Sequence, residues 1–217
     1  MNKGVDNGAF YKLGYGLYAL TVNDGSKDNG MISNTVMQVS GEPLRVAISV
    51  NKANYSHGVI KSTGLVNVNC LTEEAGFYIF EWLGFSSGRD VNKFEGTSLP
   101  RTENGLIYLQ DCVNAVLSLK VEEYTDLGSH GLFICSVTEA KVLDAAAPSM
   151  TYAYYHAHVK PKPAAKRSEK VESGGERSEN KRYVCKICGH IYEGEELPAD
   201  YVCPICKHGS EDFEQLD

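Results

Sequence analysis

The sequence predicts a mainly β protein, a barrel with a few helices, followed by a small metal-binding domain. From about residue 16 to residue 159, short apolar runs alternate with Gly, Asn and Asp, as expected for antiparallel strands joined by turns. Two segments have a helical period, and the last part of the chain carries two Cys-x-x-Cys pairs. A barrel is the expected architecture because closure removes the exposed edges of a sheet.

The strands are expected where apolar residues alternate or cluster between turn residues. The first is expected at 16–22, and the Asn, Asp and Gly residues of 23–30 indicate a hairpin into a second strand at 31–37. In a later strand, Ala115, Leu117 and Leu119 alternate with other residues, which predicts one buried face. The remaining strands are expected at 44–50, 65–71, 106–109, 115–122 and 132–142.

Two helices are expected to interrupt the strands, at 54–62 and at 73–83. The second follows an acidic first turn and places Phe77 and Phe80 on or near an inward stripe. There is no regular alternation of strands and helices, no G-x-G-x-x-G sequence opening a helix, and no Walker A loop. A doubly wound nucleotide-binding sheet is therefore not expected.

Composition excludes some partners. The 217 residues carry a net charge of -7, so the chain lacks the basic face that nucleic acid binding requires. The amino terminus has no apolar core of a signal peptide, and no run approaches the roughly 18 apolar residues of a membrane span. The seven cysteines fit a reducing compartment. We therefore expect a soluble, cytoplasmic protein with neither nucleic acid nor membrane as a partner.

Residues 160–182 form a charged segment without aromatic side chains, which predicts a flexible linker between two domains. The net charge is -5 for residues 1–159, +4 for 160–182 and -6 for 183–217. An acidic small domain on a basic tether is typical of docking onto a basic protein surface, and ordinary solvation accounts for the same charges.

Four cysteines in two short pairs, Cys185 with Cys188 and Cys203 with Cys206, predict a tetrahedral metal site. Four thiolates select zinc or iron. A segment of about 35 residues cannot fold by apolar burial alone, so metal binding would supply folding energy.

The whole segment 183–217, with Tyr-x-Cys-x-x-Cys-Gly, then Leu-Pro-x-Asp-Tyr-x-Cys-Pro-x-Cys and an acidic tail with Phe213, resembles rubredoxin. This resemblance implies one iron held by the four cysteines. Lys207 stands where that family usually has Gly, and His190 replaces a frequent Tyr; neither is a ligand position.

Three segments of the first domain, 28–39, 50–57 and 84–94, resemble the flavin-reductase-like, FMN-binding split barrels, and the similarity extends over about residues 8–158. The resemblance implies a Greek-key barrel, a homodimer and NAD(P)H as co-substrate. The order of the domains is similar to that of high-molecular-weight rubredoxins. It implies electron transfer from NAD(P)H through FMN to iron, and then to a flavodiiron protein that reduces nitric oxide or dioxygen.

Residues that can hold FMN follow from these segments. Backbone and side-chain groups that can bind the isoalloxazine edge are expected from Asn34, Thr35 and Val36. Charge or helix-end donors for the phosphate are expected from Asn51, Lys52, Ser56, His57, Arg89 and Lys93. The resemblance places three residues at the end of the domain, Tyr154, Tyr155 and His156, near the flavin, and no general acid or nucleophile is expected.

Two alternatives remain open at this stage. The chain could be a flavin reductase that releases reduced flavin to another enzyme, or an FMN-binding protein with a structural zinc module. A Ser56–His57 nucleophile pair is disfavoured because neighbouring residues point apart. A metal at His156 and His158 is disfavoured because no third ligand is evident.

Overall fold

The computed structural model describes residue 4 and residues 6–161, 181–185, 191–203 and 209–216. The chain divides into two compact units, Met1–Val159 and Lys160–Asp217. Each unit is considered by itself.

The first unit is built on a seven-stranded antiparallel sheet with the order β2-β1-β5-β6-β7-β4-β3. The prediction of a mainly β fold with a few helices is therefore confirmed. The strands are β1 (Tyr18–Asn23), β2 (Asp28–Ser33), β3 (Val36–Gly41), β4 (Leu44–Asn51), β5 (Leu65–Leu71), β6 (Val113–Asp126) and β7 (His130–Val142).

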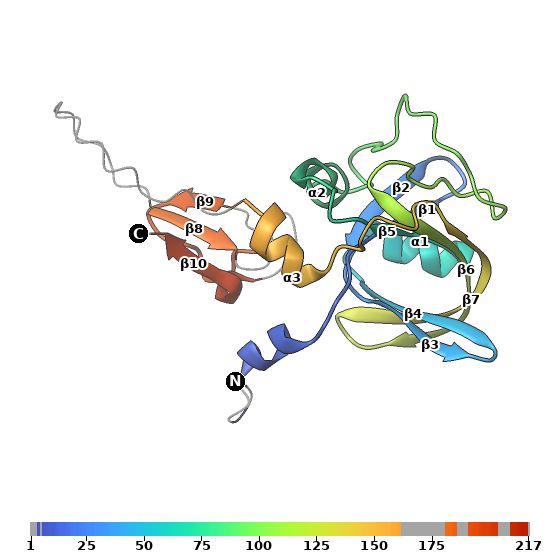
Figure 1. Ribbon diagram of the computed structural model, residues 1–217. Coiled ribbons are helices and arrows are strands. Elements are labelled where there is room, and N and C mark those ends of the chain that lie inside the picture. Colours follow the sequence, from blue (N-terminus) through green and yellow to red (C-terminus); the bar gives the residue numbers. More distant parts are fainter. Residues whose placement is uncertain (1–3, 5, 162–180, 186–190, 204–208, 217) are drawn as a thin grey trace. The chain divides into compact units, whose positions relative to one another are not determined.

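The two edge strands of this sheet, β2 and β3, are consecutive in the chain and are separated only by Asn34 and Thr35. Each residue of an extended chain spans at most about 3.6 Å, so the end of β2 and the start of β3 must lie close together. The sheet is therefore curled into a barrel with a split between β2 and β3 (Figure 1). The single strand predicted at 31–37 was wrong, because its first half pairs with β1 and its second half with β4.

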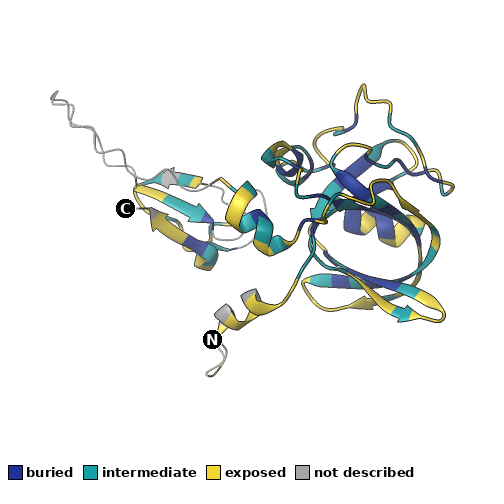
Figure 2. Ribbon diagram, in the orientation of Figure 1, coloured by how far each residue is buried: buried dark blue, intermediate teal, exposed yellow. Residues whose placement is uncertain are grey.

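The interior of the barrel is filled by aliphatic side chains and Phe133, which is fully buried. Strand alternation explains this arrangement: Leu20 and Val22 of β1 point inward, and Thr21 points to the opposite face. Buried residues concentrate along the central strands, and exposed ones occupy the tip of the β3–β4 hairpin (Figure 2). The inner cluster comprises Leu20, Val22, Val46, Ile48, Val50, Val59, Ile60, Val66, Val68, Leu119, Phe133 and Cys135.

Helix α1 (Tyr55–Thr63) buries Val59 and Ile60 in this inner core, which confirms the helix predicted at 54–62. It ends at Gly64, whose φ of 71° is the left-handed conformation that glycine adopts without steric cost. The Gly64 N–H donates to Ile60 O, so the helix ends with a satisfied carbonyl.

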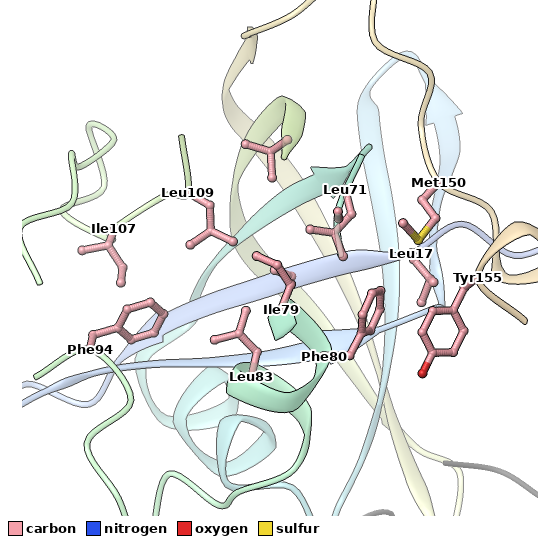
Figure 3. Packing of buried hydrophobic residues seen from close by; sticks show 13 residues of the cluster. Leu17, Leu71, Ile79, Phe80, Leu83, Phe94, Ile107, Leu109, Met150 and Tyr155 are labelled. Carbon is pink, nitrogen blue, oxygen red and sulfur yellow. The ribbon is translucent and has the colours of Figure 1, made fainter. Parts of the chain in front are cut away.

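A second apolar layer covers the outer face of β1 and β5, where helix α2 (Phe77–Gly84) packs (Figure 3). Ile79, Phe80 and Leu83 are its buried residues. The helix begins at Phe77, four residues later than predicted; before it, Glu73 N–H donates to Pro148 O and Ala75 N–H donates to Thr72 O in a turn. The other buried members of this layer are Leu17, Ala19, Leu71, Ala75, Phe94, Ile107, Leu109, Val113, Met150 and Tyr155.

Residues 106–109 are not a strand, contrary to the prediction, although their apolar side chains are buried as a strand's would be. Their backbone is bound partly by the neighbouring segment, where Tyr108 N–H donates to Pro100 O and Leu106 O accepts from Thr102 N–H, both at 3.0 Å, and partly by side chains of the sheet. Asn67 Nδ2 donates to the carbonyls of Leu106 and Ile107, both at 3.2 Å, and Leu109 N–H donates to Asn69 Oδ1 at 2.8 Å. Polar side chains and one isolated bridge, between Arg101 and Ile107, thus take the place of a full strand ladder.

The second unit contains a small antiparallel sheet with the order β10-β8-β9. Its core is made by Cys185, Cys203 and Phe213, and aromatic side chains of Tyr183, Tyr192 and Tyr201 pack around it together with Leu197. The strands are β8 (Lys181–Cys185), β9 (Ile191–Gly194) and β10 (Phe213–Leu216).

Short helical turns complete the two units. None of the helices in the described part of the chain is long and apolar enough to cross a membrane. The turns are η1 (Asn7–Lys12), α3 (Tyr152–Tyr154), the π-helical η2 (Tyr155–Val159) and η3 (Ser210–Asp212).

Candidate functional site

Asn34, Thr35 and Val36, expected at the flavin ring, lie at the split between the two edge strands. Thr35 Oγ1 donates to Asn34 Oδ1 at 3.0 Å, and Thr35 O accepts from the backbone N–H of Ser49 at 3.1 Å. The second of these hydrogen bonds attaches the two-residue junction between β2 and β3, Asn34 and Thr35, to β4. The junction offers backbone and amide groups where the sheet has no neighbouring strand.

The start of α1 is a second polar region. The N-cap residue Asn54 makes no side-chain hydrogen bond to the helix, and its backbone O accepts from His57 N–H at 3.1 Å, so the earlier N–H groups of the first turn remain suited to an anion. Asn51 Oδ1 instead accepts from Ala53 N–H at 2.9 Å. Ser56, in the first turn, is buried, and its Oγ accepts from Asn29 Nδ2 at 2.8 Å.

Asn29 of β2 has one carboxamide atom, assigned as Oδ1, that is buried with no hydrogen-bond partner among the described residues. It was not among the predicted site residues. Its neighbours in the sequence, Asp28 and Gly30, are typical of a turn, so no signal distinguished it from a turn residue. A buried polar atom of this kind needs a partner, and a ligand hydroxyl can pair with a carboxamide in either orientation.

Arg89 lies against the same end of α1. Its guanidinium donates to Ala53 O at 2.9 Å and lies 5.8 Å from the centre of the Tyr55 ring. Lys27 Nζ lies 5.6 Å from that ring, and the Tyr55 hydroxyl donates to Asp24. Two cations therefore surround an aromatic side chain that sequence reasoning did not single out.

Lys52 is next to this region but already paired. Its Nζ lies 2.7 Å from Asp126 Oδ2, and both side chains are exposed. The hydrogen bond to Asp126 raises the pKa of Lys52. An exposed pair of this kind is weak and can exchange for another anion.

His57 points away from Ser56, into the inner core. Its Nε2 is 3.3 Å from the Tyr124 hydroxyl, and its ring lies 5.4 Å from that of Phe133. Burial, with smaller effects of Lys61 and Lys52, lowers the pKa of His57, so the imidazole is neutral at pH 7. The structure thus places His57 in a different environment from Ser56 and Arg89.

Lys93 is also separate from α1. Its Nζ donates to Leu83 O at 2.6 Å and to Gly30 O at 2.8 Å, at the end of α2 and in β2. Burial lowers the pKa of Lys93 to about 8.

Tyr154, Tyr155 and His156 belong to the outer apolar layer and its margin. Tyr155 is buried, with its ring 4.4 Å from that of Phe80, while Tyr154 and His156 are half-buried. His156 lies 4.4 Å from the ring of Tyr152.

Cys185 and Cys203, two of the four predicted metal ligands, are both fully buried in the core of the second unit. Cys185 ends β8 and pairs in register with Phe213 of β10. Cys203 follows Val202, which forms a bridge with Gly209. Cys188 and Cys206 lie outside the described residues, as do His190 and Lys207.

Comparison with known proteins defines the class. Residues 10–162 match the flavin reductase like domain, and residues 183–214 match the rubredoxin-like domain of rubrerythrin. The chain therefore belongs to the flavin reductase like family, and it carries a rubredoxin-like domain at its carboxyl end.

Among relatives, the chain is similar to the high molecular weight rubredoxin of Moorella thermoacetica, with 35% identity over 98% of this chain and 100% of that protein. It is also similar to a ferric-chelate reductase (NAD(P)H) of Archaeoglobus fulgidus, with 34% identity over 70% of this chain and 89% of that protein. These homologues support an oxidoreductase.

The fold is also that of a solved FMN-binding protein from Thermus thermophilus. The TM-score is 0.58 at 19% identity, over 66% of this chain and 79% of that chain. The flavin reductase fold and the rubredoxin-like domain together imply flavin and iron as cofactors.

Proposed function

We propose that this protein is an electron-transfer oxidoreductase that takes electrons from NAD(P)H at an FMN site in the barrel and passes them to an iron held by four cysteines. The observation that carries this proposal is that one chain contains both a flavin reductase like domain and a rubredoxin-like domain. A two-electron donor and a one-electron acceptor need a converter between them, and flavin supplies that chemistry.

The polar groups at the first turn of α1 support an FMN phosphate there. Arg89 supplies charge, and the first turn supplies N–H groups that the Asn54 side chain does not cap. The unpartnered atom of Asn29, next to Ser56, would pair with a hydroxyl of the ribityl chain once Gly88, which lies against it, moved away. The junction of Asn34 and Thr35 would bind the edge of the flavin ring.

The proposed roles of the predicted residues differ according to their surroundings. Asn51, Ser56 and Arg89 would bind the phosphate end directly. Lys52 would do so only after leaving Asp126. His57 would support the site from the core through Tyr124.

Tyr154, Tyr155 and His156 would limit solvent access at the end of the barrel domain. Tyr155 is held by its contact with Phe80, whereas the half-buried Tyr154 and His156 could approach a bound ring or NAD(P)H.

The proposed iron ligands are Cys185, Cys188, Cys203 and Cys206. The burial of Cys185 and Cys203 beneath aromatic side chains supports a site shielded from water, as a redox-active tetrathiolate needs. A structural zinc would use the same four thiolates.

We further propose that the acceptor is a protein with a basic docking surface, plausible candidates being flavodiiron proteins that reduce nitric oxide or dioxygen. The net charge of -6 over residues 183–217 supports docking to a basic surface, and the flavodiiron identity rests on the family resemblance alone.

A homodimer in the cytoplasm is also proposed. The edge strand β3 exposes Met37 to 63% and Val39 to 46%, an apolar edge that a second copy would cover.

The decisive experiment is anaerobic stopped-flow mixing of the purified protein with NADH or NADPH. We expect flavin absorbance to bleach first and ferric-thiolate absorbance to follow. Iron that stays oxidised while the flavin is fully reduced would contradict the relay. Loss of FMN on gel filtration would favour release of free reduced flavin, and zinc by elemental analysis would favour the structural module.

A further inference from the structure

The segment between α2 and Phe94, residues 84–93, crosses the start of α1. At its far point, Gly88 O accepts from Lys27 Nζ at 2.6 Å, and the next residue, Arg89, donates to Ala53 O at 2.9 Å. A Cβ on Gly88 would lie 2.2 Å from Asn29 Oδ1 and 2.8 Å from Tyr55 Cδ1. The segment therefore touches β2 and α1 directly, and only glycine fits at this approach.

The two ends of the same segment are joined at its base. Lys93 Nζ donates to Leu83 O, and Trp82 Nε1 donates to Lys93 O at 2.7 Å. These reciprocal bonds close residues 84–92 into a loop, which we call the strap. The third bond, from Lys93 Nζ to Gly30 O, attaches the base of the strap to β2.

Lys93 donates hydrogen bonds to backbone carbonyls, as expected for a lysine with a structural role. Two of its three N–H groups are used by backbone carbonyls, one of them among the last carbonyls of a helix, which lack partners within the helix itself. A Cβ on Gly30 would lie 3.0 Å from Leu83 and 3.1 Å from Phe94, so the strand, the helix end and the base of the strap are tightly packed. None of the ion pairs found among the described residues includes Lys93.

We propose that Lys93 is a positioning residue: it closes the base of the strap and thereby holds Arg89 at the first turn of α1, without contacting a ligand itself. This inference rests on the proposed FMN site, because Arg89 is the group that would bind the phosphate. It assigns Lys93 a different role from the direct phosphate contact expected from the sequence.

The first test uses the flavin-free full-length protein, so that it does not depend on FMN. Lys93→Met is compared with Lys61→Met, an exposed lysine of α1 whose removal changes the net charge equally. By hydrogen exchange with mass spectrometry, we expect the amides of 84–92 to exchange about tenfold faster in Lys93→Met and at the original rate in Lys61→Met. Unchanged exchange in Lys93→Met would overturn the proposal.

A second variant keeps this test informative if Lys93→Met does not fold. Trp82→Phe retains an aromatic ring but removes the Nε1 donor to Lys93 O. We expect faster exchange confined to the strap. Protection of the strap equal to that of the original protein would contradict a loop closed at this base.

The second test measures affinity for FMN and for riboflavin, which lacks the phosphate. We expect Lys93→Met to weaken FMN binding about tenfold and riboflavin binding less than about twofold. In an Arg89→Ala background, Lys93→Met should weaken FMN binding less than about twofold further, because the lysine acts through the arginine.

Full additivity of the two substitutions would show that Lys93 binds the phosphate independently, and would overturn the proposal. If the original protein binds no FMN, the proposed function fails, whereas the exchange result on the strap stands or falls separately.

Discussion

The barrel and the small cysteine-containing unit are stabilised in different ways. Among the described residues, the barrel has two buried clusters of 12 and 13 residues, one inside the curled sheet and one on the outer face of β1 and β5. The core of the second unit has three buried residues, of which two are cysteines. The barrel can fold by apolar burial, whereas the small unit depends on what its thiolates bind.

The largest expected effect is that of removing one thiolate. Cys203→Ser should abolish metal binding and unfold residues 181–216, because the remaining apolar core is too small to offset the chain entropy. The barrel should keep its unfolding midpoint and any bound flavin. Elemental analysis and thermal unfolding followed at Trp82 measure the two results. A lowered midpoint of the barrel would show that the units are not independent.

The converse substitution tests the barrel alone. Phe133→Ala removes a fully buried ring from the inner core and should lower the free energy of unfolding by about 3–5 kcal/mol. Metal content of the small unit should be unchanged. Urea denaturation measures the loss, with Phe10→Ala, at a side chain that is 56% exposed, as the control. Equal losses for the two variants would exclude the inner cluster as the main source of stability.

The smallest expected effect is the change in the stability of the barrel with pH. Burial lowers the pKa of Lys93 from its ordinary value of 10.5 to about 8. Between these values the unfolded chain binds more protons than the folded one, so the stability of the barrel should rise with pH. We expect a gain of about 1 kcal/mol from pH 7.5 to 9.5, less than the full shift implies because Lys93 is only partly buried.

The control for this effect is Lys93→Met, in which other titrating groups are unchanged. Urea denaturation at each pH gives the slope of stability against pH. The variant should show a flatter slope than the original protein, and parallel slopes would mean that Lys93 does not titrate in this range.

Much of the barrel could be predicted from the sequence because alternation and turn residues are local signals. The predictions were wrong where contacts between residues far apart in the chain determine the backbone conformation. Residues 106–109 are apolar because they are buried, but Asn67, Asn69 and the neighbouring residues 100–102 supply their hydrogen bonds in place of a strand ladder. A residue's hydrophobicity reports its burial and does not identify the partner of its backbone.

The candidate site was predictable only in part for a similar reason. Ser56 and Arg89, far apart in the chain, both lie at the start of α1, and the sequence could indicate them only as residue types that bind phosphate. His57 and Lys93 have the residue types of phosphate ligands, but the structure turns both side chains toward other parts of the fold. Asn29 belongs to the candidate site only because β2 lies beside α1, and no local sequence pattern indicates that arrangement.

The two-residue junction between β2 and β3 has a consequence for how this sequence can vary. Connections between strands usually accept insertions readily, because lengthening a loop costs little entropy. Asn34 and Thr35 connect opposite margins of one sheet and Thr35 O accepts from Ser49 N–H of β4, so an added residue there would shift the start of β3 against both β2 and β4. Natural variants should therefore differ in length at the exposed hairpin turns and keep this crossing at constant length.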